Sequence, residues 1–264
     1  MNPIIVKLGG TAAADADVLA RLVADLNEDF SGSAVIVHGG GAEASAWCSR
    51  LGLEPRFVDG VRQTTPEEMA VVEMVLAGKV NTAVVRTAAA AGAKPVGLSL
   101  SDAGLCFGQP VGDPVVNRTA RPDRVDPAIL THLLTGSFLP VVSSIGSFWD
   151  GSRGDGGACN INADDAALAL ARAVQARALV FLSDIPGVQE DGGIHSSLDR
   201  RVSEALIERG IISGGMTAKV RSALSAVDAG VGAVVIGAYH ERGDIQALIG
   251  GRSGTRIMAT GGEQ

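Results

Sequence analysis

The chain has 264 residues, of which 46% are hydrophobic and 19% charged, so it can bury a large core and is not a disordered chain. Its net charge of −7 leaves no general basic surface, which argues against nucleic acid as a partner. The 3 cysteines fit no metal-ligand spacing and indicate reduced thiols in a cytoplasmic protein. The first residues form an apolar, strand-like run without a basic leader, so neither secretion nor a membrane location is expected.

Short apolar runs alternate with helical patterns along the chain. The predicted strands cover residues 4–8, 34–37, 95–100, 139–143, 178–182 and 233–236. The predicted helices cover residues 15–28, 42–51, 66–91, 127–134, 164–174, 202–209 and 217–229. This alternation predicts a parallel sheet covered by helices on both faces, with ligands bound beyond the carboxyl ends of the strands.

Two stretches interrupt this alternation. Residues 54–65 have apolar residues on either side of an Asp-Gly pair, which predicts a hairpin folded out of the sheet. Residues 104–126 are rich in Pro and Gly and receive no assignment. The chain is expected to form two lobes, divided between residues 176 and 180, without a flexible linker.

Two glycine runs follow predicted strands and are typical of phosphate sites. The first strand ends in Lys7, Leu8 and then paired glycines, Gly9 and Gly10, whose backbone N–H groups can approach an anion. By itself, Lys7 is better explained as a strand-end lysine that reaches water, followed by an ordinary turn. The second run, residues 39–41, leads directly into a helix N-terminus, where unpaired N–H groups favour anions. His38 before it is interpreted as a structural residue.

The second run also permits a rival interpretation. Gly39, Gly41 and Ala44 satisfy the dinucleotide-binding pattern G-x-G-x-x-A, and Asp59 follows at about the twenty-residue distance of a ribose contact. An oxidoreductase would fit that pattern. However, the run follows the second strand rather than the first, Asp59 falls in the hairpin, and Lys7 has no role in this interpretation.

Further motifs occur in a fixed order along the chain: Gly60-Val61-Arg62-Gln63-Thr64, Val141-Val142-Ser143-Ser144-Ile145-Gly146, Asn160-Ile161-Asn162-Ala163-Asp164, Leu182-Ser183-Asp184-Ile185-Pro186-Gly187, Gly215-Met216-Thr217-Ala218-Lys219 and Gly254-Thr255-Arg256-Ile257. Together with the glycine runs, this set resembles the acetylglutamate kinases of the amino-acid-kinase family. The resemblance extends from the first predicted strand to the last, over almost the whole chain.

This resemblance implies a fold and an activity. The implied fold is a three-layer α/β/α sandwich around a mostly parallel central sheet. An N-lobe, residues 1–176, would bind the acidic amino-acid derivative and form the dimer, and a C-lobe, residues 177–264, would bind ATP. The implied reaction transfers the γ-phosphoryl group of ATP to the side-chain carboxylate of N-acetyl-L-glutamate, the second step of arginine biosynthesis. Mg²⁺ would be held mainly by the nucleotide, without a metal site of the protein.

The resemblance also assigns catalytic roles to three residues. Lys7 and Lys219 match the lysines that act on phosphoryl oxygens from the two lobes, and Asp164 matches the carboxylate that orients them. Phosphoryl transfer requires alignment and neutralisation of spreading negative charge, which two lysines can supply. A helix-start carboxylate stabilised by the helix dipole is the alternative for Asp164.

Binding roles follow from the same resemblance. Arg62 matches the residue that binds the α-carboxylate of the substrate, although a solvated hairpin arginine is the alternative. Asn160 would hold the amino-acid portion, and Gly39 and Gly40 would contact substrate and phosphate through N–H groups. The nucleotide is assigned to Gly9, Gly10, Asp184, Pro186, Gly187, Ser213 and Met216, with plain core packing as the alternative for Met216.

Residues 121–127 depart from the glycine-containing segment usual in the family, near the substrate lobe. A kinase for an N-modified 2-aminoadipate of lysine biosynthesis, carried on a protein, is therefore the main alternative. The hairpin balances Arg56 and Arg62 against Glu54 and Asp59, which favours a free small substrate. An inactive amino-acid sensor on the same fold is disfavoured because both lysines and the aspartate are retained.

Members that respond to arginine generally carry a helix before the first strand. This sequence begins at the first predicted strand. A homodimer without arginine feedback and without a signalling-protein partner is expected.

Overall fold

The computed structural model describes residues 2–9, 15–58, 60–149, 151 and 156–259. The strands are β1 (Ile4–Leu8), β2 (Ala34–His38), β3 (Arg56–Val58), β4 (Val61–Gln63), β5 (Pro95–Ser99), β6 (Cys106–Pro110), β7 (Thr119–Val125), β8 (Leu139–Ser143), β9 (Ile145–Phe148), β10 (Ala158–Ile161), β11 (Ala178–Leu182), β12 (Gln189–Glu190), β13 (Gly193–Ile194), β14 (Ser197–Leu198), β15 (Ala233–Gly237) and β16 (Thr255–Ile257). The helices are α2 (Ala16–Asp29), α3 (Gly41–Arg50), α4 (Pro66–Glu73), the π-helix η1 (Met74–Val80), α5 (Asn81–Ala90), the 3₁₀ turn η2 (Asp102–Gly104), α6 (Ala128–Thr135), α7 (Ala163–Ala173), α8 (Arg200–Glu208), α9 (Gly215–Asp228) and α10 (Asp244–Ile249).

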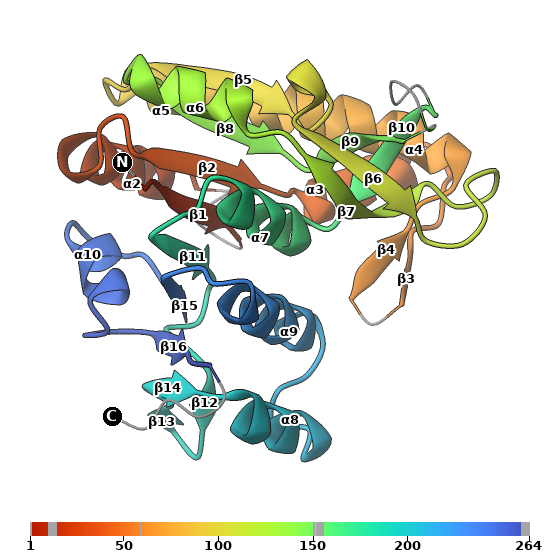
Figure 1. The fold of residues 1–264 in the computed structure, drawn as a ribbon. Coiled ribbons are helices and arrows are strands. Elements are labelled where there is room, and N and C mark those ends of the chain that lie inside the picture. The colour runs from red at the N-terminus through yellow and green to blue at the C-terminus, as the bar shows by residue number, and fades with distance from the viewer. Residues whose placement is uncertain (1, 10–14, 59, 150, 152–155, 260–264) are drawn as a thin grey trace.

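An eight-stranded sheet in the order β14-β16-β15-β11-β1-β2-β8-β5 forms the centre of the molecule (Figure 1). Its strands pair in parallel except at the β15–β16 pair. The apolar sequences of β2 and β11 are buried along their whole length, as a sheet covered on both faces requires. All six strands predicted from the sequence belong to this sheet.

Helices cover the sheet in two layers, which confirms the predicted three-layer sandwich. One core cluster combines α2, α5 and α10 with Ile4 and Val6 of β1, and another combines α6, α7, α8 and α9 with Ile5. Side chains alternate along a strand, so Lys7 lies on the same face as Ile5, which is the face covered by α7 and α9. Among the described residues, no helix is long and apolar enough to cross a bilayer.

The segment without a sequence assignment contributes β6 and β7 to a small closed barrel with β9 and β10 (Figure 1). Proline and glycine interrupt the alternation in these strands, and a register shift lies between Phe107 and Gly108. A Cβ at Gly108 would lie 2.8 Å from the Sγ of Cys159, so the barrel interior requires glycine there. Burial raises the pKa of the Cys106 and Cys159 thiols to about 12, and the three cysteines are free.

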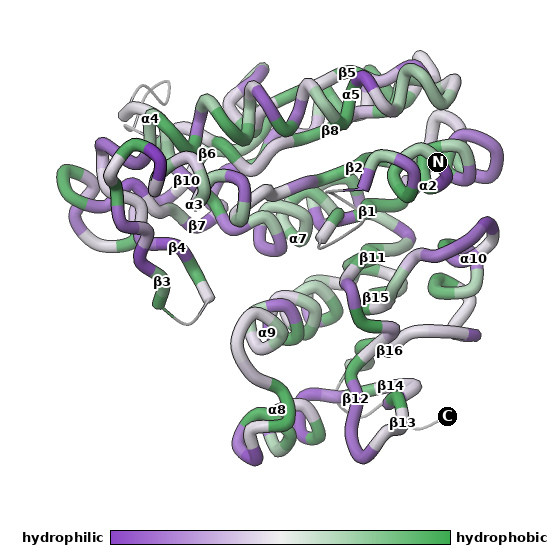
Figure 2. The backbone as a smooth tube through the Cα atoms, turned by 180° about the vertical axis from the view of Figure 1, so that it is seen from behind, coloured by the Kyte–Doolittle hydropathy of each residue, from purple (hydrophilic) through white to green (hydrophobic). Residues whose placement is uncertain are grey.

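The helix predicted over residues 66–91 is one continuous run with a π-helical middle. Thr65 and Glu68 form a capping box at its start, and Pro66 occupies the first helical turn. The π-helix η1 separates α4 from α5. The predicted hairpin is also present as β3–β4, and it stands away from the sheet in the view from behind (Figure 2).

The predicted lobe boundary falls just before β11. Because β11 pairs with β1 from Ile4↔Ala178 to Lys7↔Phe181, the central sheet runs across this boundary without interruption. The β3–β4 hairpin and the barrel lie on the side of the sheet formed by β1, β2, β5 and β8. Helices α8, α9 and α10 pack on or near the side formed by β11, β14, β15 and β16 (Figure 1). The division of function between the two lobes stays an interpretation.

Candidate active site

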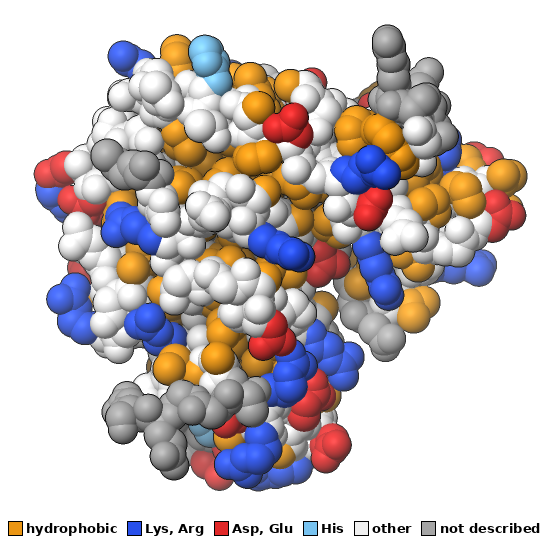
Figure 3. All heavy atoms as spheres, viewed as in Figure 1, with side chains coloured by type: hydrophobic (Ala, Val, Ile, Leu, Met, Phe, Trp, Pro, Cys, Tyr) orange, Lys and Arg blue, Asp and Glu red, His pale blue; other side chains and the backbone are white. Residues whose placement is uncertain are grey.

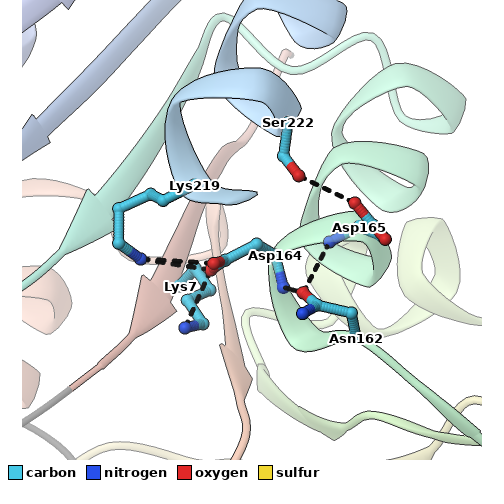
Figure 4. Close-up of polar contacts among 6 residues, drawn as sticks. All are labelled: Lys7, Asn162, Asp164, Asp165, Lys219 and Ser222. Carbon is cyan, nitrogen blue, oxygen red and sulfur yellow. Dashed lines mark hydrogen bonds and ion pairs between the residues drawn. The ribbon is translucent and has the colours of Figure 1, made fainter. Parts of the chain in front are cut away.

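One carboxylate and two lysines from three separate elements meet in the structure (Figure 4). The Nζ of Lys7, on β1, lies 2.8 Å from the Oδ1 of Asp164 at the start of α7. The Nζ of Lys219, on α9, lies 3.3 Å from each carboxylate oxygen of Asp164. The structure thus brings together the three residues to which the sequence assigned catalysis.

Local sequence explains why Asp164 points to the lysines. Asn162 caps α7, and its Oδ1 accepts hydrogen bonds from the N–H groups of Asp164 at 2.8 Å and Asp165 at 3.4 Å. Asp164 therefore lies in the first helical turn, where the helix dipole favours a carboxylate, as the alternative interpretation held. The ammonium of Lys219 also lies 5.4 Å from the centre of the Phe181 ring on β11.

The cluster is buried and carries more positive than negative charge. The side chains of Lys7, Asp164 and Lys219 are 12%, 10% and 9% exposed. Burial opposes ionisation of Asp164, but the charges of both lysines outweigh it and hold the carboxyl pKa below its ordinary 3.8. Burial lowers the pKa of Lys219, and Asp164 opposes this shift. With both lysines protonated, one positive charge remains for an incoming anion.

A cavity of about 190 Å³ opens beside this cluster. Lys7 and Asp164 line it together with the β3–β4 hairpin, the start of α3 and the end of β10. The surface is hollowed beside the hairpin in the space-filling view (Figure 3). The predicted substrate residues Gly39, Gly40, Arg62 and Asn160 all line this cavity. Lys219 approaches from the α9 side and contacts the cavity-lining Asp164.

Arg62 is not a solvated hairpin side chain, since it is only 6% exposed. Its Nη2 donates to the carbonyl of Gly41 at 3.0 Å and to the hydroxyl of Ser45, and its guanidinium lies 4.8 Å from the Phe57 ring centre. Its Nη1 is buried without a hydrogen-bond partner in the described structure. Because an unpaired buried donor costs free energy, Nη1 is suited to an anionic ligand.

Asn160 connects the barrel to the base of the hairpin. Its Nδ2 donates to the Oγ1 of Thr64 at 2.9 Å, and its backbone N–H donates to the carbonyl of Arg118 at 2.9 Å. The Oδ1 of Asn160 takes no part in these two hydrogen bonds, and the residue lines the cavity. Asn160 is therefore placed where it can hold a small polar ligand.

The second glycine run forms one wall of the cavity. Gly40 has φ +138°, and a Cβ there would lie 2.8 Å from the Cδ2 of Leu76, so a side chain is excluded on two grounds. His38 is fully buried, with Nδ1 2.8 Å from the carbonyl of Gly39 and Nε2 3.0 Å from the Nδ2 of Asn81. Burial lowers the pKa of His38, which therefore acts as a neutral structural residue.

The first glycine run is described only in part. A Cβ at Gly9 would lie 2.6 Å from the carbonyl oxygen of Leu182, so the turn after β1 requires glycine. Gly10 lies outside the described residues, as does Asp59 of the rival dinucleotide pattern.

The nucleotide-binding residues predicted in the C-lobe, residues 177–264, do not line this cavity. Asp184, Pro186 and Ser213 are exposed on loops. A Cβ at Gly187 would lie 2.7 Å from the Oγ1 of Thr255, so the loop after β11 requires glycine where it approaches β16. Met216 packs against the main hydrophobic core, as its alternative interpretation held.

Sequence reasoning missed several residues that support the site. Asn162, in the pattern Asn-x-x-Asp before a helix, carried a recognisable cap signal. Ser45 and Asn81 carried none, because their contacts with Arg62 and His38 join segments far apart in sequence. The same applies to Ser222, whose Oγ donates to Asp165 at 2.7 Å.

Comparison with known proteins shows the family to which the chain belongs. Residues 2–238 match the sequence profile of the Amino acid kinase family. The chain belongs to this family. An acetylglutamate kinase of Parasynechococcus marenigrum (strain WH8102) is 40% identical over 239 residues, which cover 88% of this chain and 80% of that protein. An acetylglutamate kinase of Chloroflexus aurantiacus (strain ATCC 29366 / DSM 635 / J-10-fl) is 39% identical over 234 residues, covering 88% and 90%.

Solved structures agree with this family membership. A Streptococcus mutans UA159 protein superposes with a TM-score of 0.81 at 25% identity, covering 97% of this chain and 98% of that chain. A Giardia carbamate kinase has a TM-score of 0.69 at 16% identity, covering 97% and 98%, and shows the same fold. The resemblance inferred from the ordered motifs is confirmed, and the dinucleotide-binding alternative loses its support.

Proposed function

We propose that this amino acid kinase transfers the γ-phosphoryl group of ATP to the side-chain carboxylate of N-acetyl-L-glutamate, in arginine biosynthesis. The observation that carries the proposal is the convergence of Lys7 and Lys219 on Asp164 beside a cavity that contains Arg62. The acetylglutamate kinases at about 40% identity over most of the chain support this acceptor.

The chemistry requires no general base of the protein. A carboxylate oxygen of the acceptor attacks the γ-phosphorus, the bond from that phosphorus to the β–γ bridging oxygen breaks, and ADP leaves with the electron pair. The acceptor is already ionised, so no proton has to be removed. The protein's contribution is to align the two oxygens and to neutralise the charge that spreads over the phosphoryl oxygens.

Lys7 and Lys219 are suited to this neutralisation. Their ammonium groups both contact one carboxylate, and Asp164 holds them in place before a phosphoryl group arrives. Since water is largely excluded from these side chains, their electrostatic effect on a transferring group is stronger than at an exposed site. Asp164 thus positions the lysines rather than reacting.

Arg62 is suited to the α-carboxylate of the acceptor. Its Nη2 is already committed to Gly41 and Ser45, and its buried Nη1 remains for a ligand oxygen. Asn160 and the N–H groups of Gly39 and Gly40 would hold the rest of the acceptor and the phosphoryl group.

ATP is proposed to extend from this cavity toward the side of the sheet formed by β11, β14, β15 and β16. Gly9 and Gly10 would border its phosphates, and the loops with Asp184, Pro186, Gly187, Ser213 and Met216 would border its nucleoside. Within the described residues, no group of three or more His, Cys, Asp or Glu side chains is arranged to hold a metal ion. As the family implies, we propose that Mg²⁺ enters with the nucleotide phosphates, whose charge it would partly neutralise.

A homodimer, a cytoplasmic location and the lack of arginine feedback stay predictions. Sedimentation of the purified protein at micromolar concentration, with and without arginine, tests the oligomeric state, and a kinase assay under the same two conditions tests the feedback. A dimer in both conditions is expected, and a hexamer or an arginine-dependent loss of activity would contradict the prediction.

The proposed activity is tested by an ATP-consumption screen with N-acetyl-L-glutamate, N-modified 2-aminoadipate, glutamate and aspartate. Hydroxylamine is added to convert any acyl phosphate to a hydroxamate. We expect the highest kcat/KM and a stoichiometric hydroxamate with N-acetyl-L-glutamate. ATP consumption without hydroxamate, or a preference for the aminoadipate derivative, would overturn the assignment of reaction or of acceptor, respectively.

A further inference from the structure

A second polar contact joins α7 to α9 next to the Asp164–Lys219 pair (Figure 4). The Oγ of Ser222 donates a hydrogen bond to the Oδ1 of Asp165 at 2.7 Å. Asp165 directly follows Asp164, and Ser222 lies three residues after Lys219, which places both α9 residues on one helix face. The consecutive carboxylates of Asp164 and Asp165 on α7 therefore contact two residues, Lys219 and Ser222, that are neighbours on one face of α9.

The contact is partly buried, and Asp165 is not needed to cap its helix. Ser222 is 7% exposed, and Asn162 already accepts the N–H groups at the start of α7. Burial raises the pKa of Asp165 above its ordinary 3.8, and the hydrogen bond from Ser222 opposes this more strongly than the charge of Arg121 does. A carboxylate kept in such a place is costly unless its partner compensates.

The start of α9 has no side-chain cap, although the N–H groups of Met216 and Thr217 donate to the carbonyls of Ser213 and Gly214 and the Oγ1 of Thr217 donates to the carbonyl of Ile212 at 3.3 Å. The helix begins after Gly214, at φ +56°, and this residue offers no side-chain cap. The first helical residue is Gly215, and Lys219 follows within about one turn. An uncapped helix start leaves the first N–H groups unpaired within the helix and favours fraying. The Asp165–Ser222 contact lies about two turns further along α9, one turn beyond Lys219.

We propose that Asp165 is a positioning residue. Its contact with Ser222 fixes the rotation of α9 about its axis and its position along that axis, and so keeps the Lys219 ammonium beside Asp164 and Lys7. Asp165 contacts no reacting atom, so its effect passes entirely through α9. The kinetic consequence of this inference rests on the proposed kinase activity, whereas the placement of Lys219 does not.

The kinetic test compares variants of the two partners. Asp165→Ala lowers kcat by about 10-fold or more, because a displacement of about 1 Å in a catalytic group is enough to cost that much. The KM values for ATP and for N-acetyl-L-glutamate change less than about 2-fold, since the ground-state contacts remain. Ser222→Ala has the same effect, and the double variant is no worse than either single variant.

Two further variants separate positioning from a general structural role. Asp165→Asn keeps an oxygen acceptor for Ser222 and is expected to restore most of kcat. Ser225→Ala removes a hydroxyl one turn further along α9, where it donates only to the carbonyl of Arg221, and leaves kcat unchanged. Additive effects of the two alanine variants, or an Asp165→Asn variant as impaired as Asp165→Ala, would overturn the proposal.

A chemical readout makes the test independent of activity. The folded proteins are treated briefly with an acetylating N-hydroxysuccinimide ester, and acetylation of Lys219 is quantified by mass spectrometry relative to Lys79, whose side chain is 54% exposed. Asp165→Ala and Ser222→Ala each raise the relative labelling of Lys219 several-fold, and Ser225→Ala does not. Unchanged labelling in variants of normal circular dichroism overturns the positioning role.

The outcomes of the two readouts distinguish this inference from the proposed function. If the wild-type protein phosphorylates no carboxylate but the labelling of Lys219 rises as expected, the kinase proposal fails and the positioning proposal holds. If the wild-type protein is an active kinase and both readouts are unchanged in Asp165→Ala, the positioning proposal alone fails. Should Asp165→Ala not fold, Ser222→Ala and Asp165→Asn give the same two comparisons.

Discussion

The acceptor end and the nucleotide end of the candidate site differ in how firmly their residues are fixed. At the acceptor end, Arg62 is 6% exposed and already held by two hydrogen bonds, and Gly40 is closely packed. At the nucleotide end, Pro186 and Ser213 lie exposed on loops. Groups fixed before the ligand arrives lose less entropy on binding. Substitutions at the acceptor end and in the lysine cluster should therefore cost more than substitutions in the nucleotide loops.

The largest expected effect comes from the two lysines between these ends. Lys7→Arg and Lys219→Arg should each lower kcat by about 100-fold or more. A guanidinium places its charge differently from an ammonium, and the charge at these positions stabilises the transition state more than it stabilises bound ATP. The dissociation constant of ATP, measured by calorimetry, should change less than about 3-fold. Lys94→Arg, at an exposed position before β5, is the control. Equal losses in ATP binding and turnover would contradict the assignment.

Asp164→Asn should reduce both turnover and stability, because it leaves two buried ammonium groups without their counter-ion. The free energy of unfolding should fall by about 3 kcal/mol at pH 7. Since the folded pKa of Asp164 lies below 3.8, its contribution is present above that pH and is lost as the pH falls through the folded value. Urea unfolding at several pH values measures this, and a difference that persists unchanged into strong acid would contradict it.

Arg62→Lys should act on the acceptor alone. Lysine lacks the planar fork that holds Gly41 and Ser45 while leaving Nη1 for a ligand. We expect the KM for N-acetyl-L-glutamate to rise about 10-fold or more, with the KM for ATP nearly unchanged. Arg56→Lys, at an exposed position of the same hairpin, should change neither. An unchanged acceptor KM in Arg62→Lys would remove this residue from the site.

The smallest effect is expected at the nucleotide end. Ser213→Ala should raise the KM for ATP by no more than about 3-fold, because an exposed hydroxyl exchanges ligand contacts for water contacts at little net cost. The acceptor KM and kcat should remain the same. A loss of kcat comparable to that of the lysine variants would show that the nucleotide loops are fixed as firmly as the acceptor end.

The sequence predicted the sheet because each central strand is a short apolar run with clear neighbours. It also predicted the meeting of Lys7 and Lys219, through the resemblance of ordered motifs rather than from either residue alone. The barrel was not predicted because Gly108, Pro110 and Pro122 break the alternation of β6 and β7. The barrel is stabilised because its four strands pair into a closed ring without free edges. That pairing joins segments far apart in sequence, so local patterns do not reveal it.

Side-chain burial within the site was also beyond the sequence. From the residues alone, Arg62 was best explained as a solvated hairpin side chain, whereas Phe57, Ser45 and the start of α3 enclose it. The Asp165–Ser222 contact depends on how α7 packs against α9 across 57 residues. Patterns of period 2 or 3.6 assign a residue to a face but do not say which residue of another element lies opposite.

The central claim is that two lysines from separate parts of the chain act on one phosphoryl group. It is tested most directly by a crystal structure with ADP, magnesium, aluminium fluoride and N-acetyl-L-glutamate, in which the fluoride occupies the place of the transferring group. We expect the Nζ atoms of Lys7 and Lys219 both to lie within about 3 Å of fluoride atoms, with Asp164 still in contact with both lysines. A structure in which either ammonium faces away from the fluoride would contradict it.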